Sequence, residues 1–310
     1  MIEFGDCRET MRRWKEQGVK AQTCVTSPPY YGLRDYGHDG QIGLEETPEQ
    51  YIKAMVEVFR CVWDVLEDNG TLWLNIGDSY YSNTKGSGGA SEKQDSNAGS
   101  FFNAGSRFNA GSLPLKPKDL IGIPWMMAFA LRADGWYLRQ DIIWHKPNPM
   151  PESVQDRCTK AHEYIFLLSK SQSYYFDNDA IKYPVKQDWG TRDRSDGKYH
   201  NEGSGLQPHS GLEKSYEMAN KRSVWTVTTK PYKGAHFATF PPDLITPCIL
   251  AGAPAGGVVL DPFMGSGTTA AVAIANGRNY LGCELNSAYK ELQDIRILDA
   301  HLGAAQMELI

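Results

Sequence analysis

The most informative segment of the chain reads Val258-Val259-Leu260-Asp261-Pro262-Phe263-Met264-Gly265-Ser266-Gly267-Thr268-Thr269. Residues 257–260 have the apolar pattern of a short buried strand, and an acid follows them. Gly265 and Gly267 allow a tight turn and a close approach of the backbone to a ligand. Residues 268–275 then have the pattern of a helix. This order predicts the cofactor-binding corner of a doubly wound α/β sheet.

Two other glycine-rich motifs fit this segment poorly. A phosphate-binding P-loop has a lysine after its last glycine, whereas Thr268 follows Gly267 here. A dinucleotide-binding fingerprint has a third glycine, which this segment lacks. The beginning Asp261-Pro262-Phe263 is foreign to both motifs. An ordinary strand-to-helix turn without a ligand is the remaining alternative.

An acid also ends the next predicted strand, Asn279-Tyr280-Leu281-Gly282-Cys283-Glu284. Glu284 lies 17 positions after Gly267. This is close to the spacing of roughly 20 residues at which an acid binds ribose hydroxyls in doubly wound folds. We therefore interpret Glu284 as a ribose ligand, the alternative being a solvated strand end.

A second motif, Thr26-Ser27-Pro28-Pro29-Tyr30-Tyr31-Gly32, follows the apolar run at 21–25. The prolines fix the backbone and remove two N–H donors, which leaves carbonyl groups free to accept hydrogen bonds. The target of such a loop would be an exocyclic NH2 group of a base. That nitrogen is a poor nucleophile because its lone pair is delocalised into the ring. The Ser27 side chain and the Pro28 carbonyl would polarise its N–H bonds, and Tyr30 offers a flat face for stacking. A proline-rich turn that merely closes a strand is the alternative.

Together, the two motifs resemble those of the DNA amino-methyltransferases, which methylate cytosine N4 or adenine N6. The tetrad of that family is Asp/Ser/Asn-Pro-Pro-Tyr/Phe, here Ser27-Pro28-Pro29-Tyr30. The catalytic loop precedes the cofactor loop, as in the β group of the family. The resemblance covers roughly residues 1–177 and 231–300. It implies an α/β fold with a doubly wound, mostly parallel sheet of the class I methyltransferase (Rossmann-like) type, in permuted order.

The resemblance also implies a cofactor, S-adenosylmethionine, and a set of residues that hold it. Asp6 would contact the adenine ring, while Phe240 and Pro241 would pack on that ring or serve only as packing residues. Glu284 would bind the ribose. The remaining predicted cofactor residues belong to the glycine-rich loop, and they are Asp261, Pro262, Phe263, Gly265, Gly267 and Thr268.

The implied substrate is double-stranded DNA, whose target base must rotate out of the stack before its amino group is accessible. Methyl transfer would then be direct, without a covalent enzyme intermediate. Ser27 at the first tetrad position favours cytosine N4, and adenine N6 stays open because the same acceptors bind either amino group. An RNA or protein methyltransferase usually has Asn first and the reverse loop order. A DNA-binding regulator without catalytic activity is a further alternative.

Composition sets broader limits. The 310 residues suffice for one large α/β domain and a smaller lobe. The six cysteines include no C-x-x-C pair and the histidines show no ligand spacing, so neither a disulfide framework nor a metal is expected. Cys248 follows a proline, as in cytosine-C5 enzymes, but lies before the cofactor strand and is rejected as a nucleophile.

The setting of the protein is also an expectation from sequence. No apolar run is long enough to span a bilayer and no signal peptide is recognisable, which predicts a cytoplasmic protein. The family resemblance implies that it is nucleoid-associated and of prokaryotic or phage origin. A cognate restriction endonuclease is a candidate partner. Either a monomer or a homodimer is expected.

Three regions are predicted: a catalytic half at 1–177, a target-recognition region at 178–235 and a cofactor-binding half at 236–310. The middle region has ten basic and seven acidic residues, although the chain carries a net charge of −5. Its candidate DNA contacts are Arg192, Arg194, Lys198, Lys221 and Arg222. Within the first half, the low-complexity loop 82–112 contains Asn-Ala-Gly-Ser three times and is predicted to be mobile. It would close over DNA or have no role.

The expected elements alternate along the chain, which predicts a mostly parallel sheet with helices on both faces. Strands are expected near 2–5, 22–26, 71–76, 139–144, 163–168, 257–260 and 279–283. Those at 139–144 and 163–168 would form a hairpin that supports the pocket. Helices are expected near 48–67, 118–134, 243–252, 267–276 and 287–301. Both motifs follow strands and would meet at the carboxyl edge of the sheet.

Overall fold

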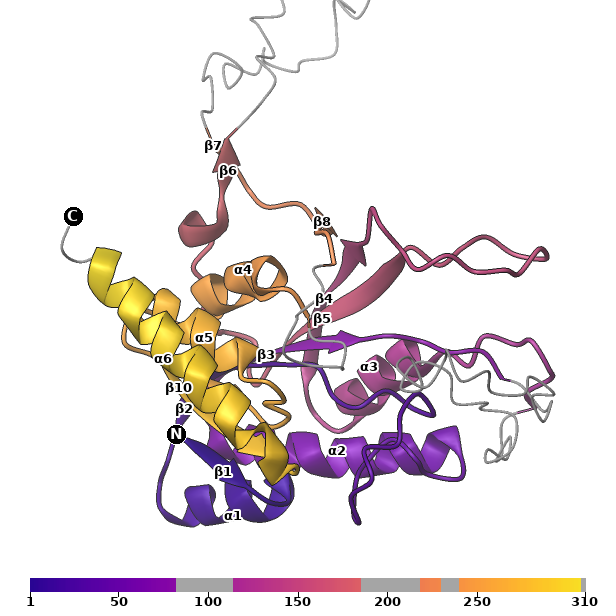
Figure 1. Cartoon of the computed structure of the whole chain (residues 1–310), viewed down its shortest axis with the longest axis horizontal. Coiled ribbons are helices and arrows are strands. Elements are labelled where there is room, and N and C mark those ends of the chain that lie inside the picture. Colours follow the sequence, from indigo (N-terminus) through magenta and orange to yellow (C-terminus); the bar gives the residue numbers. More distant parts are fainter. Residues whose placement is uncertain (82–113, 185–217, 230–239, 308–310) are drawn as a thin grey trace, which may run out of the picture.

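The computed structural model of the protein describes residues 1–81, 114–184, 218–229 and 240–307 (Figure 1). The predicted loop at 82–112 lies outside the described residues. Three of the predicted DNA contacts, Arg192, Arg194 and Lys198, also lie outside them.

The described residues contain an eight-stranded sheet that is mostly parallel, as predicted. Among neighbouring strands, β5 (His162–Ser169) alone runs antiparallel to both of its partners, and it forms the predicted hairpin with β4 (Tyr137–His145). A separate pair, β6 (Tyr183–Pro184) and β7 (Met218–Ala219), is antiparallel. The order across the large sheet is β1 (Ile2–Phe4), β10 (Asn279–Glu284), β9 (Val258–Asp261), β2 (Ala21–Thr26), β3 (Leu66–Ile76), β5 (His162–Ser169), β4 (Tyr137–His145) and β8 (Val224–Thr226).

Helices cover both faces of the sheet (Figure 1). One face carries α1 (Cys7–Glu16), α2 (Pro48–Val65) and α3 (Ile123–Ala133). The other carries α4 (Pro242–Gly252), α5 (Thr268–Ala275) and α6 (Lys290–Met307). Two short 3-10 helices, η3 (Asp179–Ile181) and η4 (Ser287–Tyr289), complete the described elements.

Strand β3 shows why the sheet has two buried faces. Successive side chains of a strand point to opposite sides. Leu72 and Leu74 accordingly belong to the hydrophobic core beneath α1–α3, whereas Trp73 belongs to the core beneath α4 and α5. A continuous apolar run such as this is typical of a strand that is buried on both sides.

Local sequence signals explain where the helices begin. Thr47 and Gln50 form a capping box at the start of α2, and Pro48 occupies the first turn. Asp6 caps α1 by accepting a hydrogen bond from the Arg8 backbone N–H at 2.8 Å. Helix α1 was not predicted from the sequence.

The limits of two predicted helices differ clearly from the structure, and one strand was not predicted. The helix expected at 118–134 begins only at Ile123, because Gly122 has a left-handed conformation (φ +86°) and Pro124 fits the first turn. The helix expected at 287–301 begins as the 3-10 helix η4 and continues as α6 to Met307. Strand β8 lies in the predicted target-recognition region at 178–235, where no strand was expected, and it pairs with β4.

Among the helices of the described ranges, none is both long enough and apolar enough to cross a membrane.

Candidate active site

The two motifs meet at the carboxyl edge of the sheet, as their positions after strands predicted. Strands β2 and β9 are parallel neighbours, with Cys24 opposite Leu260. Thr26, at the end of β2, donates a hydrogen bond from its hydroxyl to Asp261 Oδ1 at 2.6 Å. This bond directly joins the catalytic loop to the cofactor loop, although the two residues are 235 positions apart in the sequence.

Asp261 organises the cofactor loop from inside the protein. Besides Thr26, it accepts a hydrogen bond from the Thr269 hydroxyl at 2.6 Å and one from the Phe263 backbone N–H at 3.0 Å. Its exposed fraction is 1%. Burial raises the pKa of Asp261 to about 6, although the three donors oppose this shift. Direct contact of this carboxylate with the cofactor stays a prediction.

The buried Asp261 gives a pH-dependent prediction. Because burial raises its pKa to about 6, the folded protein retains this proton at pH values where the unfolded chain has released it. Protonation of Asp261 therefore contributes to the free energy of unfolding at low pH. This contribution falls by roughly 2–3 kcal/mol as the pH rises from about 4 to about 6. The neutral variant Asp261→Asn lacks this titration.

We expect the free energy of unfolding of the wild type, minus that of Asp261→Asn, to decrease over the same pH range. Urea unfolding of both proteins at pH 4, 5, 6 and 7 measures this difference. A difference that does not change with pH would contradict a raised pKa at this residue.

Glu284 lies at the end of β10 and faces the glycine turn. Its Oε2 accepts a hydrogen bond from the Gly265 backbone N–H at 2.7 Å, and its Oε1 accepts one from the Asn286 N–H at 2.8 Å. Burial raises the pKa of Glu284 above its ordinary value. Each carboxylate oxygen has a second lone pair, so the side chain can still accept hydrogen bonds from a ligand.

The glycine turn needs its glycines and is braced by α6. Gly265 and Gly267 have φ values of +54° and +84°, which favour glycine. From α6, Gln293 donates a hydrogen bond to the Gly265 carbonyl at 2.6 Å. Arg296 donates to the hydroxyls of Ser266 and Thr268, at 2.6 and 2.7 Å. Gln293 and Arg296 were not predicted as site residues, since polar residues on a surface helix carry no recognisable motif.

Four other predicted cofactor residues are buried or pack against the core. Pro262 is buried, and Phe263 packs against the core beneath α1–α3. Pro241 is buried at the start of α4, and Phe240 packs on the core beneath that helix. Contact of Phe240 or Pro241 with the adenine ring stays a prediction.

Asp6 lies at the same edge of the sheet as Glu284, because β1 and β10 are parallel neighbours. Its carboxylate caps α1 and accepts hydrogen bonds from the Arg8 guanidinium, the shortest at 2.6 Å. The place of Asp6 is compatible with an adenine contact, which stays a prediction.

The catalytic loop is held from several sides. Tyr51 in α2 donates a hydrogen bond from its hydroxyl to the Pro29 carbonyl at 2.9 Å. Tyr31 is buried beside Tyr51, with ring centroids 5.5 Å apart. In the described part of the chain no donor contacts the Pro28 carbonyl. The loop is therefore rigid, and it presents a carbonyl oxygen that can accept a hydrogen bond from a ligand.

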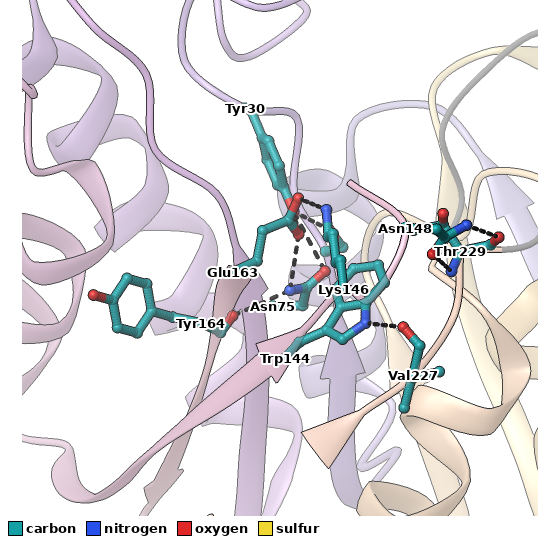
Figure 2. A network of polar contacts seen from close by, with 10 residues as sticks. Tyr30, Asn75, Trp144, Lys146, Asn148, Glu163, Tyr164, Val227 and Thr229 are labelled. Carbon is teal, nitrogen blue, oxygen red and sulfur yellow. Dashed lines mark hydrogen bonds and ion pairs between the residues drawn. The ribbon is translucent and has the colours of Figure 1, made fainter. Parts of the chain in front are cut away.

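Tyr30 is anchored by its hydroxyl (Figure 2). This group is 2.8 Å from Glu163 Oε2 and 3.3 Å from Asn75 Oδ1. Burial raises the pKa of Tyr30, so its hydroxyl stays protonated and donates. Ser27 Oγ lies 3.5 Å from the same hydroxyl. Lys146 forms an ion pair with Glu163.

Asn75, Lys146 and Glu163 were not predicted as site residues. Their strands were predicted, and the hairpin was expected to support the pocket. A usable signal existed, because Glu163 lies at the second position of the apolar strand β5 and Lys146 directly follows the end of its partner strand β4. A polar residue at such a position either reaches solvent or has a buried partner.

Of the predicted DNA contacts, the described residues include Lys221 and Arg222. The Lys221 ammonium lies 4.9 Å from the centroid of the Trp225 ring, and burial lowers its pKa. The Arg222 carbonyl accepts a hydrogen bond from the Trp225 indole N–H at 2.6 Å. Both residues precede the segment that pairs with β4, and their contact with DNA stays a prediction.

Comparison with known proteins identifies the family of this chain. The model of the N6/N4 DNA methylase family matches residues 21–294. Type II methyltransferase M.SmaI of Serratia marcescens is 48% identical over 300 residues, which cover 96% of this chain and 90% of that protein. Type II methyltransferase M.Cfr9I of Citrobacter freundii is 46% identical over 288 residues, which cover 93% and 84% of the two chains.

A solved structure shows the same fold with the cofactor bound. TTHA0409 of Thermus thermophilus, in complex with S-adenosyl-L-methionine, superposes with a TM-score of 0.58 at 24% identity. The superposition covers 97% of this chain and 94% of that one. Because the family model and both relatives span most of the sequence, the chain belongs to the N6/N4 DNA methylase family and is a Type II DNA methyltransferase that uses S-adenosylmethionine.

Proposed function

We propose that this methyltransferase modifies the N4 amino group of cytosine at a specific sequence in duplex DNA. The observation that carries the proposal is the joined pair of loops, in which Thr26 and Asp261 hold the tetrad beside the glycine turn. Ser27 at the first position of the tetrad favours cytosine. The same acceptors suit adenine N6, which is the alternative product.

The residues at the glycine turn fit S-adenosylmethionine. The bare backbone of Gly265 and Gly267 permits a close approach by the ligand, and Glu284 at the end of β10 offers carboxylate oxygens to ribose hydroxyls. When bound, S-adenosylmethionine supplies an activated methyl group on its sulfonium.

The catalytic loop would position the target base. The base leaves the helical stack and lies on Tyr30. Ser27 Oγ and the Pro28 carbonyl accept hydrogen bonds from its amino group, which directs the nitrogen lone pair toward the methyl group. With the amino group held in this way, the bound cofactor would supply its methyl group, and the amino nitrogen would lose a proton to solvent. Correct positioning supplies much of the rate enhancement.

We further propose that residues 178–235 select the DNA sequence, with Lys221 and Arg222 among the contacts. In this arrangement 1–177 is the catalytic half and 236–310 the cofactor half. A restriction endonuclease that cleaves the same sequence is the proposed partner, because the relatives are Type II methyltransferases.

Nucleoside mass spectrometry of DNA treated with the protein and S-adenosylmethionine tests the assignment of the base. Unmethylated DNA of mixed composition provides many candidate sites, and the same reaction without S-adenosylmethionine is the control. We expect N4-methylcytosine. N6-methyladenine would overturn the choice of base but leave the mechanism, whereas the absence of both products on several DNAs would overturn the proposed function.

A further inference from the structure

The Tyr30 ring is restrained both at its tip and along its side. At the tip, the hydroxyl is 2.8 Å from Glu163 Oε2. Along its side, the ring packs against the backbone of Gly77, where an added Cβ would lie 2.6 Å from Tyr30 Cε2. A glycine at this position therefore leaves the room that the ring occupies.

The acceptor of this hydrogen bond is itself fixed. Glu163 forms an ion pair with Lys146, and the side chains are 17% and 19% exposed, respectively. The Lys146 ammonium also lies 4.2 Å from the centroid of the Trp144 ring. Trp144 in turn donates a hydrogen bond to the Val227 carbonyl at 2.9 Å (Figure 2). Glu163 is thus held by a chain of contacts that begins just after β8.

A largely buried ion pair needs an explanation beyond stability. Removing two charges from water costs about as much as their attraction returns, so apolar residues of similar size often serve the fold equally well. A charged acceptor does, however, form a stronger hydrogen bond with a hydroxyl than a neutral one. The pair is therefore suited to orient Tyr30 more firmly than a neutral side chain.

We propose that Glu163, held by Lys146, is a positioning residue that fixes the plane of the Tyr30 ring on which the target base stacks. This inference rests on the proposed function, because it takes Tyr30 as the stacking residue. Glu163 acts through the Tyr30 hydroxyl and does not need to touch the base. A ring held in one plane presents the amino group to the methyl donor in one orientation, as efficient transfer requires.

A double-mutant cycle separates this role from others. Glu163→Leu removes the nearer of the two acceptors and leaves Asn75 Oδ1 at 3.3 Å. Glu163→Gln retains an acceptor oxygen, and Tyr30→Phe retains the ring without its hydroxyl. We expect Glu163→Leu and Tyr30→Phe each to lower kcat about 10-fold, without a change in the KM for S-adenosylmethionine. Glu163→Gln should stay within about 3-fold of the wild type. In the Tyr30→Phe background, Glu163→Leu should cost no more than about 2-fold further.

Independent effects of the two substitutions would overturn the proposal, since Glu163 would then act on the base or on the fold. Thermal unfolding of each variant identifies a failure to fold. If Glu163→Leu does not fold, the kcat of Tyr30→Phe alone tests the proposal. A kcat of that variant equal to the wild-type value would overturn it. Asp294→Asn, which removes the exposed ion pair with Lys290, is the matched control and should not change kcat.

The wild type and the Ser27→Ala variant distinguish a failure of this inference from a failure of the proposed function. If the wild type methylates DNA and Ser27→Ala is impaired, but Glu163 and Tyr30 show no coupling, the positioning role alone is wrong. If the wild type methylates no DNA, the proposed function itself is wrong.

Discussion

Ser27→Ala is expected to lower the rate of methyl transfer about 100-fold or more, as does loss of one polar group that stabilises a transition state in other enzymes. The serine oxygen accepts a hydrogen bond from the amino group, and this bond strengthens as the nitrogen becomes tetrahedral. Affinity for S-adenosylmethionine should stay within about 2-fold, because Ser27 belongs to the catalytic loop. Single-turnover methylation and titration calorimetry measure the two quantities.

The fold should tolerate this change. Within the described residues, the Ser27 side chain makes a long contact, 3.5 Å to the Tyr30 hydroxyl. Ser173→Ala, which alters an exposed serine outside the site, is the matched control. Wild-type transfer by Ser27→Ala would contradict the role of the serine oxygen. If the variant lost cofactor affinity by the same factor as it lost rate, Ser27 would act in cofactor binding and not in methyl transfer.

The elements that sequence reasoning located well are those whose pattern is local. The strand β9 and the helix α5 flank the glycines of a tight turn, and residues 71–76 of β3 are buried and mostly apolar. The polar first half of β3, at 67–70, was not predicted to be strand. Helix α1 was missed although its sequence carries a signal. Asp6 is a cap, and Cys7, Met11 and Trp14 recur at helical spacing on one buried face, among mostly charged neighbours. The short strand β8 gains its partner from β4, which a local pattern cannot reveal.

The site residues likewise fall into two groups: those in contiguous motifs and those that meet only in the folded chain. Ser27–Tyr30 and Asp261–Thr268 form contiguous motifs, and both were recognised in the sequence. Glu163 acquires its significance from contacts with Tyr30 and Lys146, which lie 133 and 17 positions away in the sequence. Such a group is defined by the folded chain, since the register of β4 against β5 decides which side chains meet.

A second large effect is expected at Glu284. Glu284→Gln should weaken the binding of S-adenosylmethionine about 100-fold or more, because hydrogen bonds to a charged acceptor contribute about 1.5–3 kcal/mol each and the ribose offers two hydroxyls. The amide would also place a donor against the N–H of Gly265 or of Asn286, which now donate to the carboxylate. Titration calorimetry at neutral pH measures the affinity.

The pH dependence of the same binding provides an independent test of Glu284. Burial raises its pKa, so its carboxylate becomes protonated at a higher pH than an ordinary glutamate does. Wild-type affinity for the cofactor should therefore decline on acidification before exposed glutamates titrate, and the decline should be absent in Glu284→Gln. Glu291→Gln, at an exposed acid in the first turn of α6, is the control. If Glu284→Gln and the wild type bound S-adenosylmethionine with equal affinity, Glu284 would not be a cofactor ligand. A loss of affinity at Glu284 with normal affinity at Ser27→Ala would instead assign binding to one loop and transfer to the other.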